Sequence, residues 1–338
     1  MNNMIMHNNY TSHKGNVFFE MLKDPVFMQY RKAWVNNPRM HIVAPFPLHL
    51  DIEITNRCNL RCAGCARSTD HWCANGVGDM DINMYKRIID EGVENGLYSI
   101  KLSLRGESML HHQLFDMIDY ALSHGIIDVY FNTNGTFLTD ESCQKIIASG
   151  MKRISISFDG WDKSSFERYR KGASYDKVMK GTSRLIAARE KAGSKFPKIR
   201  MQNVLYPEIK EHLDKFFALF KNKVDEIGSI DAREEGEGIE HKGTFTSTFE
   251  CPFIWQRMVI LYDGTLLPCL MHGVKDVNLL SMGNINDVSI AKQWNSERLH
   301  ALRQAHIEGR SHEIEACDQC SYRALEIKKI NEQKGINR

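Results

Sequence analysis

The chain has 338 residues, of which 42% are hydrophobic and 25% charged, and its formal net charge is +2. This length suits one large domain or a catalytic domain with an appended module, and the near-neutral charge argues against a nucleic-acid partner. No apolar run is long enough to cross a bilayer, and the N-terminal residues lack the pattern of a signal peptide. Nine cysteines, mostly clustered, fit metal thiolates in a reducing cytoplasm better than a disulfide framework.

Residues 1–47 predict a helical and irregular lead-in that ends at Pro45-Phe46-Pro47. After it, short apolar strands alternate with amphipathic helices whose apolar residues recur every three or four positions. The predicted strands are 49–55, 98–104, 127–132, 153–158, 198–204 and 226–231, and the predicted helices are 82–95, 112–124, 139–149, 175–192 and 209–221. This alternation predicts an α/β fold in which right-handed crossovers curl a parallel sheet into a barrel or part-barrel. We expect the barrel over residues 48–235 and a C-terminal module over 236–338.

Three cysteines, Cys58, Cys62 and Cys65, follow the first predicted strand with C-x3-C-x2-C spacing. They offer three thiolates to one metal centre and leave a fourth position without a local cysteine. An iron–sulfur cluster held by three cysteines has one iron free to bind a ligand, which suits catalysis. The alternatives are structural zinc, whose sites usually close all four positions with paired C-x2-C units, and a group of packed thiols.

The segment from Thr55 to Cys65 resembles the signature loop of the radical S-adenosylmethionine (radical SAM) superfamily. The resemblance implies an open (β/α)6 part-barrel, a [4Fe–4S] cluster on the three cysteines, and SAM bound to its unique iron. It also implies reductive cleavage of SAM to a 5′-deoxyadenosyl radical, with an external electron donor such as flavodoxin or ferredoxin. Gly64 departs from the family pattern, because many members carry an aromatic residue there that covers the adenine. In this chain the adenine must be packed by residues from elsewhere.

The segment 103–108 resembles the Gly-Gly-Glu-Pro motif that binds the SAM amine in this family. Glu107 matches its acid, whereas Arg105 replaces the first glycine and Ser108 replaces the proline. The alternative for Glu107 is an ordinary glutamate in a surface loop. For the residues in the next sentence, the alternatives are a place in a turn or a solvated charge on a helix. The further SAM-binding candidates that the resemblance implies, all after the third and fourth strands, are Asn132, Asn134, Ser157, Asp159 and Arg170.

A second set of cysteines lies late in the chain, at Cys251, Cys269, Cys317 and Cys320. The first two flank a segment, 261–268, that predicts a β-hairpin with an Asp-Gly turn. The pattern resembles the start of the SPASM extension of radical SAM enzymes, but the predicted helix 322–334 carries none of the further cysteines of a full module. The resemblance therefore implies one auxiliary [4Fe–4S] cluster with four cysteine ligands, as in the shortened "twitch" form of aminocyclitol dehydrogenases. Four-cysteine zinc is the alternative.

A fully ligated auxiliary cluster cannot bind substrate through iron, so its natural role is electron transfer. The first hypothesis is therefore oxidation of an alcohol to a ketone in a small polyol such as a sugar, cyclitol or aminocyclitol. Arg200, on the fifth strand, is the candidate for substrate contact, with an ion pair as the alternative. The other hypotheses are modification of a ribosomally made peptide, radical epimerisation with Cys73 as hydrogen donor, and simple electron carriage. We expect the 47 residues before the first strand to be too few for a peptide-binding domain, and Cys143 to be inert core packing.

Overall fold

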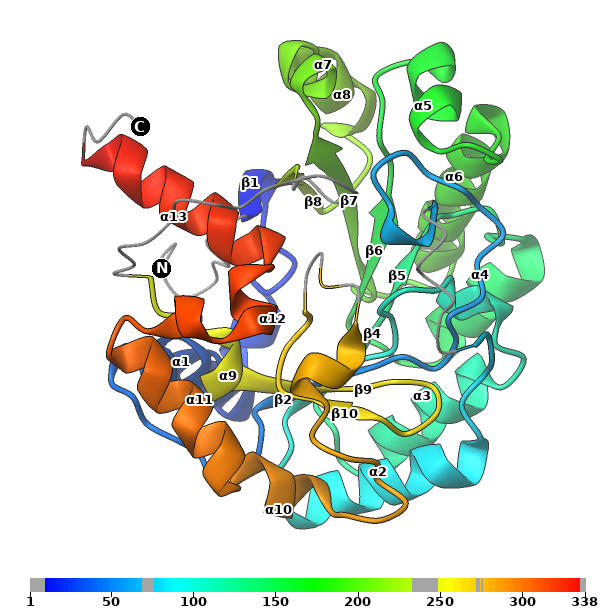
Figure 1. The fold of residues 1–338 in the computed structure, drawn as a ribbon. Helices are drawn as coiled ribbons and strands as arrows, with labels where there is room; N and C mark the ends of the chain where they lie inside the picture. Colours follow the sequence, from blue (N-terminus) through cyan, green and yellow to red (C-terminus); the bar gives the residue numbers. More distant parts are fainter. Residues whose placement is uncertain (1–9, 69–75, 233–248, 272–273, 275, 335–338) are drawn as a thin grey trace.

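The computed structural model describes residues 10–68, 76–232, 249–271, 274 and 276–334. Its centre is formed by two five-stranded, mainly parallel sheets that together curve into a barrel wall without closing, as expected for a part-barrel (Figure 1). The strands are β2 (His49–Ile52), β3 (Ser99–Lys101), β4 (Asp128–Tyr130), β5 (Asn132–Thr133), β6 (Arg153–Ser157), β7 (Lys198–Leu205) and β8 (Glu226–Asp231). The third predicted strand is divided, since β4 pairs with β3 whereas β5 pairs with β6. The predicted α/β part-barrel is confirmed.

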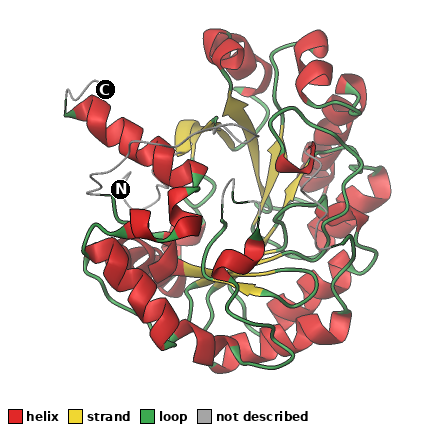
Figure 2. Cartoon of the chain, viewed as in Figure 1, coloured by secondary structure: helices red, strands yellow, loops and turns green. Residues whose placement is uncertain are grey.

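Helices cover the outer face of these sheets (Figure 2). Asp81, Thr139 and Ser174 each cap the first turn of a helix, which fixes where α2, α4 and α6 begin. The predicted helix 209–221 is divided into two, and α5 was not predicted. The barrel helices are α2 (Ile82–Glu94), α3 (Leu114–Ser123), α4 (Asp140–Ala148), α5 (Lys163–Tyr169), α6 (Tyr175–Lys191), α7 (Pro207–Glu211) and α8 (Leu213–Phe220). Short 3-10 turns are η2 (Met21–Lys23), η3 (Ala66–Ser68), η5 (Ser108–Leu110), η6 (Val277–Leu280) and η7 (Ser311–Glu313).

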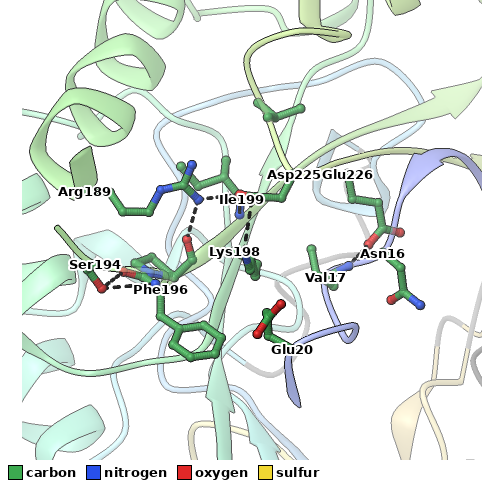
Figure 3. Close-up of polar contacts among 12 residues, drawn as sticks. Asn16, Val17, Glu20, Arg189, Ser194, Phe196, Lys198, Ile199, Asp225 and Glu226 are labelled. Atoms are coloured by element: carbon green, nitrogen blue, oxygen red, sulfur yellow. Dashed lines mark hydrogen bonds and ion pairs between the residues drawn. The ribbon is translucent and has the colours of Figure 1, made fainter. Parts of the chain in front are cut away.

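The lead-in contributes a strand to the sheet, which the helical and irregular prediction missed. β1 (Tyr10–Gly15) pairs antiparallel with β8, and α1 (Pro25–Arg39) follows it. Figure 3 shows the segment after β1 against the barrel floor, where the amide of Val17 donates to Glu226 Oε2 (2.7 Å). The neighbouring Asp225 accepts from the amide of Ile199 (2.8 Å) and pairs with Arg189. The lead-in is therefore part of the barrel wall.

The C-terminal region also extends the sheet. β9 (Arg257–Ile260) pairs parallel with β2 and antiparallel with β10 (Leu266–Leu267), so the predicted hairpin is present and joins the barrel. The remaining helices are α9 (Phe253–Gln256), α10 (Ile290–Trp294), α11 (Glu297–Ile307), α12 (Glu315–Asp318) and α13 (Ser321–Gln333). An ion pair from Lys329 to Asp231 (2.7 Å) connects α13 to the end of β8. None of the helices in the described ranges has the length and apolar character that a membrane span requires.

Candidate active site

The three cysteines of the first motif lie on the loop that follows β2. Cys58 and Cys62 are half-buried, and Cys65 is exposed. The backbone amide of Ala63 donates to the carbonyl of Tyr169 at the end of α5 (2.8 Å), which attaches this loop to the opposite side of the barrel. The carboxyl ends of parallel strands are where such barrels place their reactive groups. The loop thus presents three thiols at the mouth of the barrel.

Glu107 lies against the cysteine loop and is only 2% exposed. Its amide donates to the carbonyl of Arg57 (2.8 Å). Its carboxylate accepts from the amide of Asn134 (2.6 Å), the hydroxyl of Thr133 (2.8 Å) and the amide of Met109 (3.2 Å). Burial raises the pKa of Glu107 in spite of these donors. A carboxylate has about four acceptor positions, so one remains for the ammonium group of a ligand.

The two departures from the Gly-Gly-Glu-Pro pattern have structural partners. Arg105 forms a two-pronged ion pair with the buried Glu53, at 2.5 and 2.7 Å. Ser108 shares a hydrogen bond with Ser103 (2.7 Å). The retained Gly106 is required by space, since a Cβ atom there would lie 2.2 Å from the carbonyl oxygen of Thr55. The turn that presents Glu107 is therefore held by the partners of Arg105 and Ser108 together with the close packing of Gly106.

Asn134 follows β5 and lies directly beside the cysteine loop. Its side-chain amide donates to Asn59 Oδ1 (2.9 Å) and lies 4.0 Å from Cys58 Sγ, while its oxygen accepts from the Thr136 hydroxyl (2.7 Å). The hydrogen bonds of Asn132 are made with Ser103 and not with the cysteine loop. Its backbone N–H donates to the Ser103 hydroxyl, and its carbonyl accepts from the same hydroxyl. The structure thus brings Asn134 to the cysteine site, and the SAM contact of either residue stays a prediction.

Arg170 is held between an acid and a cysteine. Its Nε lies 2.7 Å from Asp159 Oδ2, and its Nη1 lies 3.8 Å from Cys62 Sγ. The other oxygen of Asp159 accepts from the amide of Val204 (2.8 Å). Although burial opposes it, the negative charge of Asp159 and the Cys62 thiol raise the pKa of Arg170. Arg170 is therefore a fixed cation beside the cluster cysteines, and Asp159 orients it.

An aromatic ring from a distant segment fills the space beside Gly64. Gly64 has a φ of +65°, and a Cβ atom on it would lie 2.3 Å from the hydroxyl of Tyr206. That hydroxyl donates to the carbonyl of Ala63 (2.8 Å), and the Tyr206 ring stacks on Tyr169 with centroids 5.1 Å apart. Tyr206 could not be identified from the sequence, because it follows β7 and meets the cysteine loop only in the folded chain.

The floor of the barrel and the rungs nearer the mouth differ in polarity. On the floor, charges pair with each other, as Asp51 does with Lys101 (3.0 Å) and Arg257 (2.8 Å). Asp128 pairs in the same way with Arg153 (2.9 Å). Because Ile154, Ile156, Ile199 and Met201 pack into the helix-covered core, their alternate neighbours on β6 and β7 face the barrel interior.

Those interior neighbours form two rungs. Ser155 lies opposite Arg200, and Ser157 lies opposite Gln202. Arg200 pairs with Glu226 (3.2 Å), so the ion pair considered from the sequence is present. Its substrate contact stays a prediction. The buried hydroxyl of Ser155 has no hydrogen-bond partner among the described residues, which leaves a polar group available to a ligand inside the barrel.

The second set of cysteines converges on one pocket, formed between α9, the hairpin and α11 to α13. Apolar side chains complete its lining, among them Leu280 and Leu302. The ring of Tyr322 stacks on Phe253 (4.8 Å) at the same place. The four half-buried thiols on this pocket are Cys251, Cys269, Cys317 and Cys320.

These four thiols provide the ligand set of one metal centre. A zinc ion would hold all four on a single atom. A cluster binds each thiolate to a different iron and separates the sulfurs. Burial raises the pKa of Cys269 to about 12 and that of Cys251 and Cys317 above its usual value. Bound cations are therefore needed to keep these sulfurs as thiolates.

His306, at the end of α11, contacts two of these cysteines. Its Nδ1 accepts from the amide of Cys251 (3.3 Å), and its Nε2 lies 3.5 Å from Cys317 Sγ. Burial lowers its pKa to about 4. The sequence did not single out this histidine, because its separation from both cysteines follows no ligand motif.

Of the two remaining cysteines, Cys143 and Cys73, the structure describes only the first. Cys143 is buried on α4, in the core cluster, as expected for packing. Cys73, the epimerase candidate, lies outside the described residues. Its proposed role as a hydrogen donor stays a prediction.

Comparison with known families agrees with this geometry. The model of the radical SAM superfamily matches residues 52–196, and that of the SPASM iron–sulfur cluster-binding domain matches residues 251–321. The chain belongs to the radical SAM superfamily and carries a SPASM-type domain. Its cofactors are SAM, the SAM-binding [4Fe–4S] cluster and an auxiliary iron–sulfur cluster.

Among relatives, the chain is 28% identical to a tungsten-containing aldehyde ferredoxin oxidoreductase cofactor-modifying protein of Pyrococcus furiosus, over 81% of this chain and 87% of the relative. It is 25% identical to the antilisterial bacteriocin subtilosin biosynthesis protein AlbA of Bacillus subtilis, over 77% and 62%. Two solved structures share the fold. AdoMet-bound anSMEcpe has a TM-score of 0.60 at 16% identity, covering 85% of this chain and 96% of that one. BtrN in complex with AdoMet and 2-DOIA has a TM-score of 0.52 at 18% identity, covering 82% and 92%.

Proposed function

We propose that this radical SAM protein oxidises an alcohol of a small polyol, of the sugar, cyclitol or aminocyclitol type, to a ketone. With SAM and the first cluster bound, the site supplies a 5′-deoxyadenosyl radical that takes hydrogen from the carbinol carbon. The substrate would then lose a proton from its hydroxyl group and one electron, and a cluster held by Cys251, Cys269, Cys317 and Cys320 would be the acceptor that completes a two-electron oxidation. An external donor, such as flavodoxin or ferredoxin, provides the electron that starts each turnover.

The observation that carries this proposal is the four-cysteine pocket. Cys251, Cys269, Cys317 and Cys320 all line it, which provides one thiolate for each iron of a four-iron cluster. A cluster with every iron ligated by protein has no position for a substrate, so electron transfer is the chemistry left to it. Oxidation of an alcohol by hydrogen-atom removal needs such an acceptor.

The interior wall of the barrel supports a hydroxylated substrate. Ser155, Ser157 and Gln202 face the interior on adjacent strands and offer hydroxyl and amide groups. The Ser155 hydroxyl is buried without a partner among the described residues. Neutral donors and acceptors of this kind match the hydroxyl groups of a polyol without adding charge. A bound polyol would satisfy the polar group that the protein leaves unpaired.

The residues at the mouth have distinct tasks in binding SAM. Glu107 would hold the ammonium group with its remaining acceptor position. Arg170, fixed by Asp159 at 2.7 Å, would hold the SAM carboxylate or the negative charge near Cys62. Asn134, 4.0 Å from Cys58 Sγ, would hydrogen-bond the ribose.

The test uses anaerobically purified holoenzyme, dithionite, SAM and a panel of sugars and cyclitols deuterated at carbon. The expected result is transfer of deuterium into 5′-deoxyadenosine and a ketone product that captures a hydroxylamine probe. Ser155→Ala is expected to raise KM for the active polyol, whereas the matched Ser183→Ala, on the exposed face of α6, is not. A panel in which 5′-deoxyadenosine forms without deuterium and without any ketone would contradict the proposal.

A second candidate is modification of a peptide, and the relatives favour it. AlbA, named for bacteriocin biosynthesis, aligns with 77% of this chain. Mycofactocin maturase of Mycobacterium tuberculosis aligns with 42% at 28% identity. The same deuterium-transfer assay separates the two candidates when it is run with any short peptide that a neighbouring gene is found to encode. Mass loss on that peptide and none on any polyol would establish the peptide function.

A further inference from the structure

The ring of His306 bridges two ligands of the auxiliary site that come from different parts of the chain. Its Nδ1 is 3.3 Å from the amide nitrogen of Cys251, and its Nε2 is 3.5 Å from Cys317 Sγ. The residue is 2% exposed and belongs to the lining of the four-cysteine pocket. It is therefore placed to act on the cluster and has little contact with solvent.

The position of the ring is fixed by its helix. Arg303, one turn earlier on α11, donates from Nε to the carbonyl of Ile254 (2.9 Å). Its guanidinium group also stacks over the ring of Trp294 (4.4 Å). These contacts connect α11 to α9, which begins two residues after Cys251. The distance from His306 to Cys251 is thus maintained by packing that does not involve the cluster.

The contacts also determine which nitrogen carries the proton. A backbone amide only donates, so Nδ1 must be the acceptor towards Cys251 and is unprotonated. A neutral imidazole carries one N–H, which is then on Nε2 and points to Cys317 Sγ. When the auxiliary cluster is bound, this sulfur is a thiolate, which accepts such a hydrogen bond.

We propose that His306 is a positioning residue that donates an N–H···S hydrogen bond to the Cys317 ligand and raises the reduction potential of the auxiliary cluster. A hydrogen bond to a ligating sulfur stabilises the reduced cluster more, because the reduced form carries more negative charge. A higher potential makes the cluster a better electron acceptor. This inference concerns the cluster itself and holds whichever substrate the protein oxidises.

The test is a redox titration of the holoenzyme followed by electron paramagnetic resonance. The auxiliary signal is identified as the one that added SAM leaves unchanged. His306→Leu removes both contacts, and His306→Asn keeps an acceptor near the Cys251 amide but cannot reach Cys317. Both are expected to lower the midpoint potential. His306→Gln places an amide donor near the Nε2 position and is expected to restore it towards the wild-type value.

Iron content is measured for each variant, so that only fully loaded samples are compared. Resonance Raman spectra of the wild-type protein in H2O and D2O provide a second measurement that needs no variant. The iron–sulfur stretching bands of the auxiliary cluster are expected to shift on deuteration, as an N–H···S bond requires. Equal midpoint potentials in all fully loaded variants would overturn the inference. If His306→Leu and His306→Asn lose the cluster, the absence of the isotope shift in the wild-type protein would overturn it instead.

Discussion

The two cysteine sites of this chain differ in the way that their roles require. Cys58, Cys62 and Cys65 lie on one loop at the mouth of the barrel, and one of them is exposed. The four cysteines of the second site come from three separate segments and line a pocket with mainly apolar walls. The first arrangement leaves room for a ligand and surrounds it with charged and amide groups. The second offers four thiolates, so a four-iron cluster there has no iron left for a substrate, as the proposed electron-acceptor role requires.

The neighbours of the thiols differ in the same sense. Arg170 lies 3.8 Å from Cys62 Sγ and brings a full positive charge that Asp159 balances. His306, at 3.5 Å from Cys317 Sγ, brings a neutral donor to a pocket that the cationic Arg323 also lines. A charged neighbour can bind an ionic ligand, whereas a neutral donor adjusts the potential without attracting one. The two cysteine sites thus lie in different surroundings, one on the loop after β2 and the other in a pocket between the C-terminal helices.

The largest expected effect comes from removing a cluster ligand of the first cysteine site, which we call the open site (Cys58, Cys62 and Cys65). Cys62→Ala is expected to reduce formation of 5′-deoxyadenosine to background, because the cluster loses one of its three thiolates. Iron content should fall by about four per chain while the auxiliary cluster remains. Chromatographic measurement of 5′-deoxyadenosine with iron and sulfide analysis checks both outcomes. SAM cleavage that persists in a variant lacking these irons would mean that the first site is misassigned.

Removing a ligand of the second cysteine site, which we call the closed site (Cys251, Cys269, Cys317 and Cys320), is expected to stop product formation while SAM cleavage continues. Cys269→Ala should lose the auxiliary cluster, retain uncoupled SAM cleavage within a few-fold and form no ketone. Its matched control is Cys143→Ala, a buried cysteine remote from both sites, which should retain both clusters and both activities. The assay is the ratio of ketone to 5′-deoxyadenosine. Full product formation without the auxiliary cluster would remove the electron-acceptor role.

Glu107 provides a pH test of the open site. Burial raises the pKa of its carboxyl group, so this group takes up a proton at a higher pH than an exposed glutamate, and its ionisation costs stability as pH rises through that pKa. Binding of the SAM ammonium needs the carboxylate. SAM affinity should therefore fall as pH is lowered through a value above the usual range for glutamate.

Glu107→Gln is expected to weaken SAM binding about 100-fold and to remove this pH dependence, since it removes a charge-assisted hydrogen bond. Equilibrium dialysis at several pH values measures both effects. The auxiliary cluster should be unaffected, because Glu107 contacts the first cysteine loop and does not line the four-cysteine pocket. An unchanged pH profile in the variant would assign the titration to another group.

The parts that the sequence predicted are local in the chain. Cys58, Cys62 and Cys65 share one loop, and Glu107 follows a strand by a few residues, so their spacing alone indicates their position. Strand and helix periodicity likewise predicted the barrel units. β1 was missed because Tyr10–Gly15 is a polar edge strand whose burial depends on β8, more than 200 residues later. Such a strand has no apolar periodicity of its own.

Contacts between distant segments could not be predicted. β9 continues the barrel sheet only because it pairs with β2, and no residue pattern in either strand specifies that pairing. The same holds for Tyr206 beside Gly64 and for His306 beside Cys317. In each case the chemistry depends on two segments that tertiary packing brings together. Arg200 shows the reverse, since its position was predicted but its ion pair with Glu226 depends on the next strand.

The smallest expected effect is on SAM affinity and concerns Tyr206, beside the cysteine loop of the open site. Tyr206 fills the space beside Gly64, where many radical SAM proteins carry an aromatic residue over the adenine, and it stacks on Tyr169. We expect Tyr206→Leu to weaken SAM binding about tenfold, since stacking of an aromatic ring on a base contributes about 1–3 kcal/mol. Tyr206→Phe keeps the ring and loses only the hydrogen bond to Ala63, so it should cost about 1 kcal/mol of stability with little change in affinity.

Binding is measured by equilibrium dialysis with SAM and with methionine alone, which lacks the adenine. Tyr206→Leu should weaken SAM and leave methionine unchanged, because only the first ligand carries a base to stack. Gly64→Tyr in the same background would not restore affinity, since the φ of +65° at this position is unfavourable for a residue with a side chain. Equal weakening of both ligands would place Tyr206 in the support of the cysteine loop through Ala63, and not over the adenine.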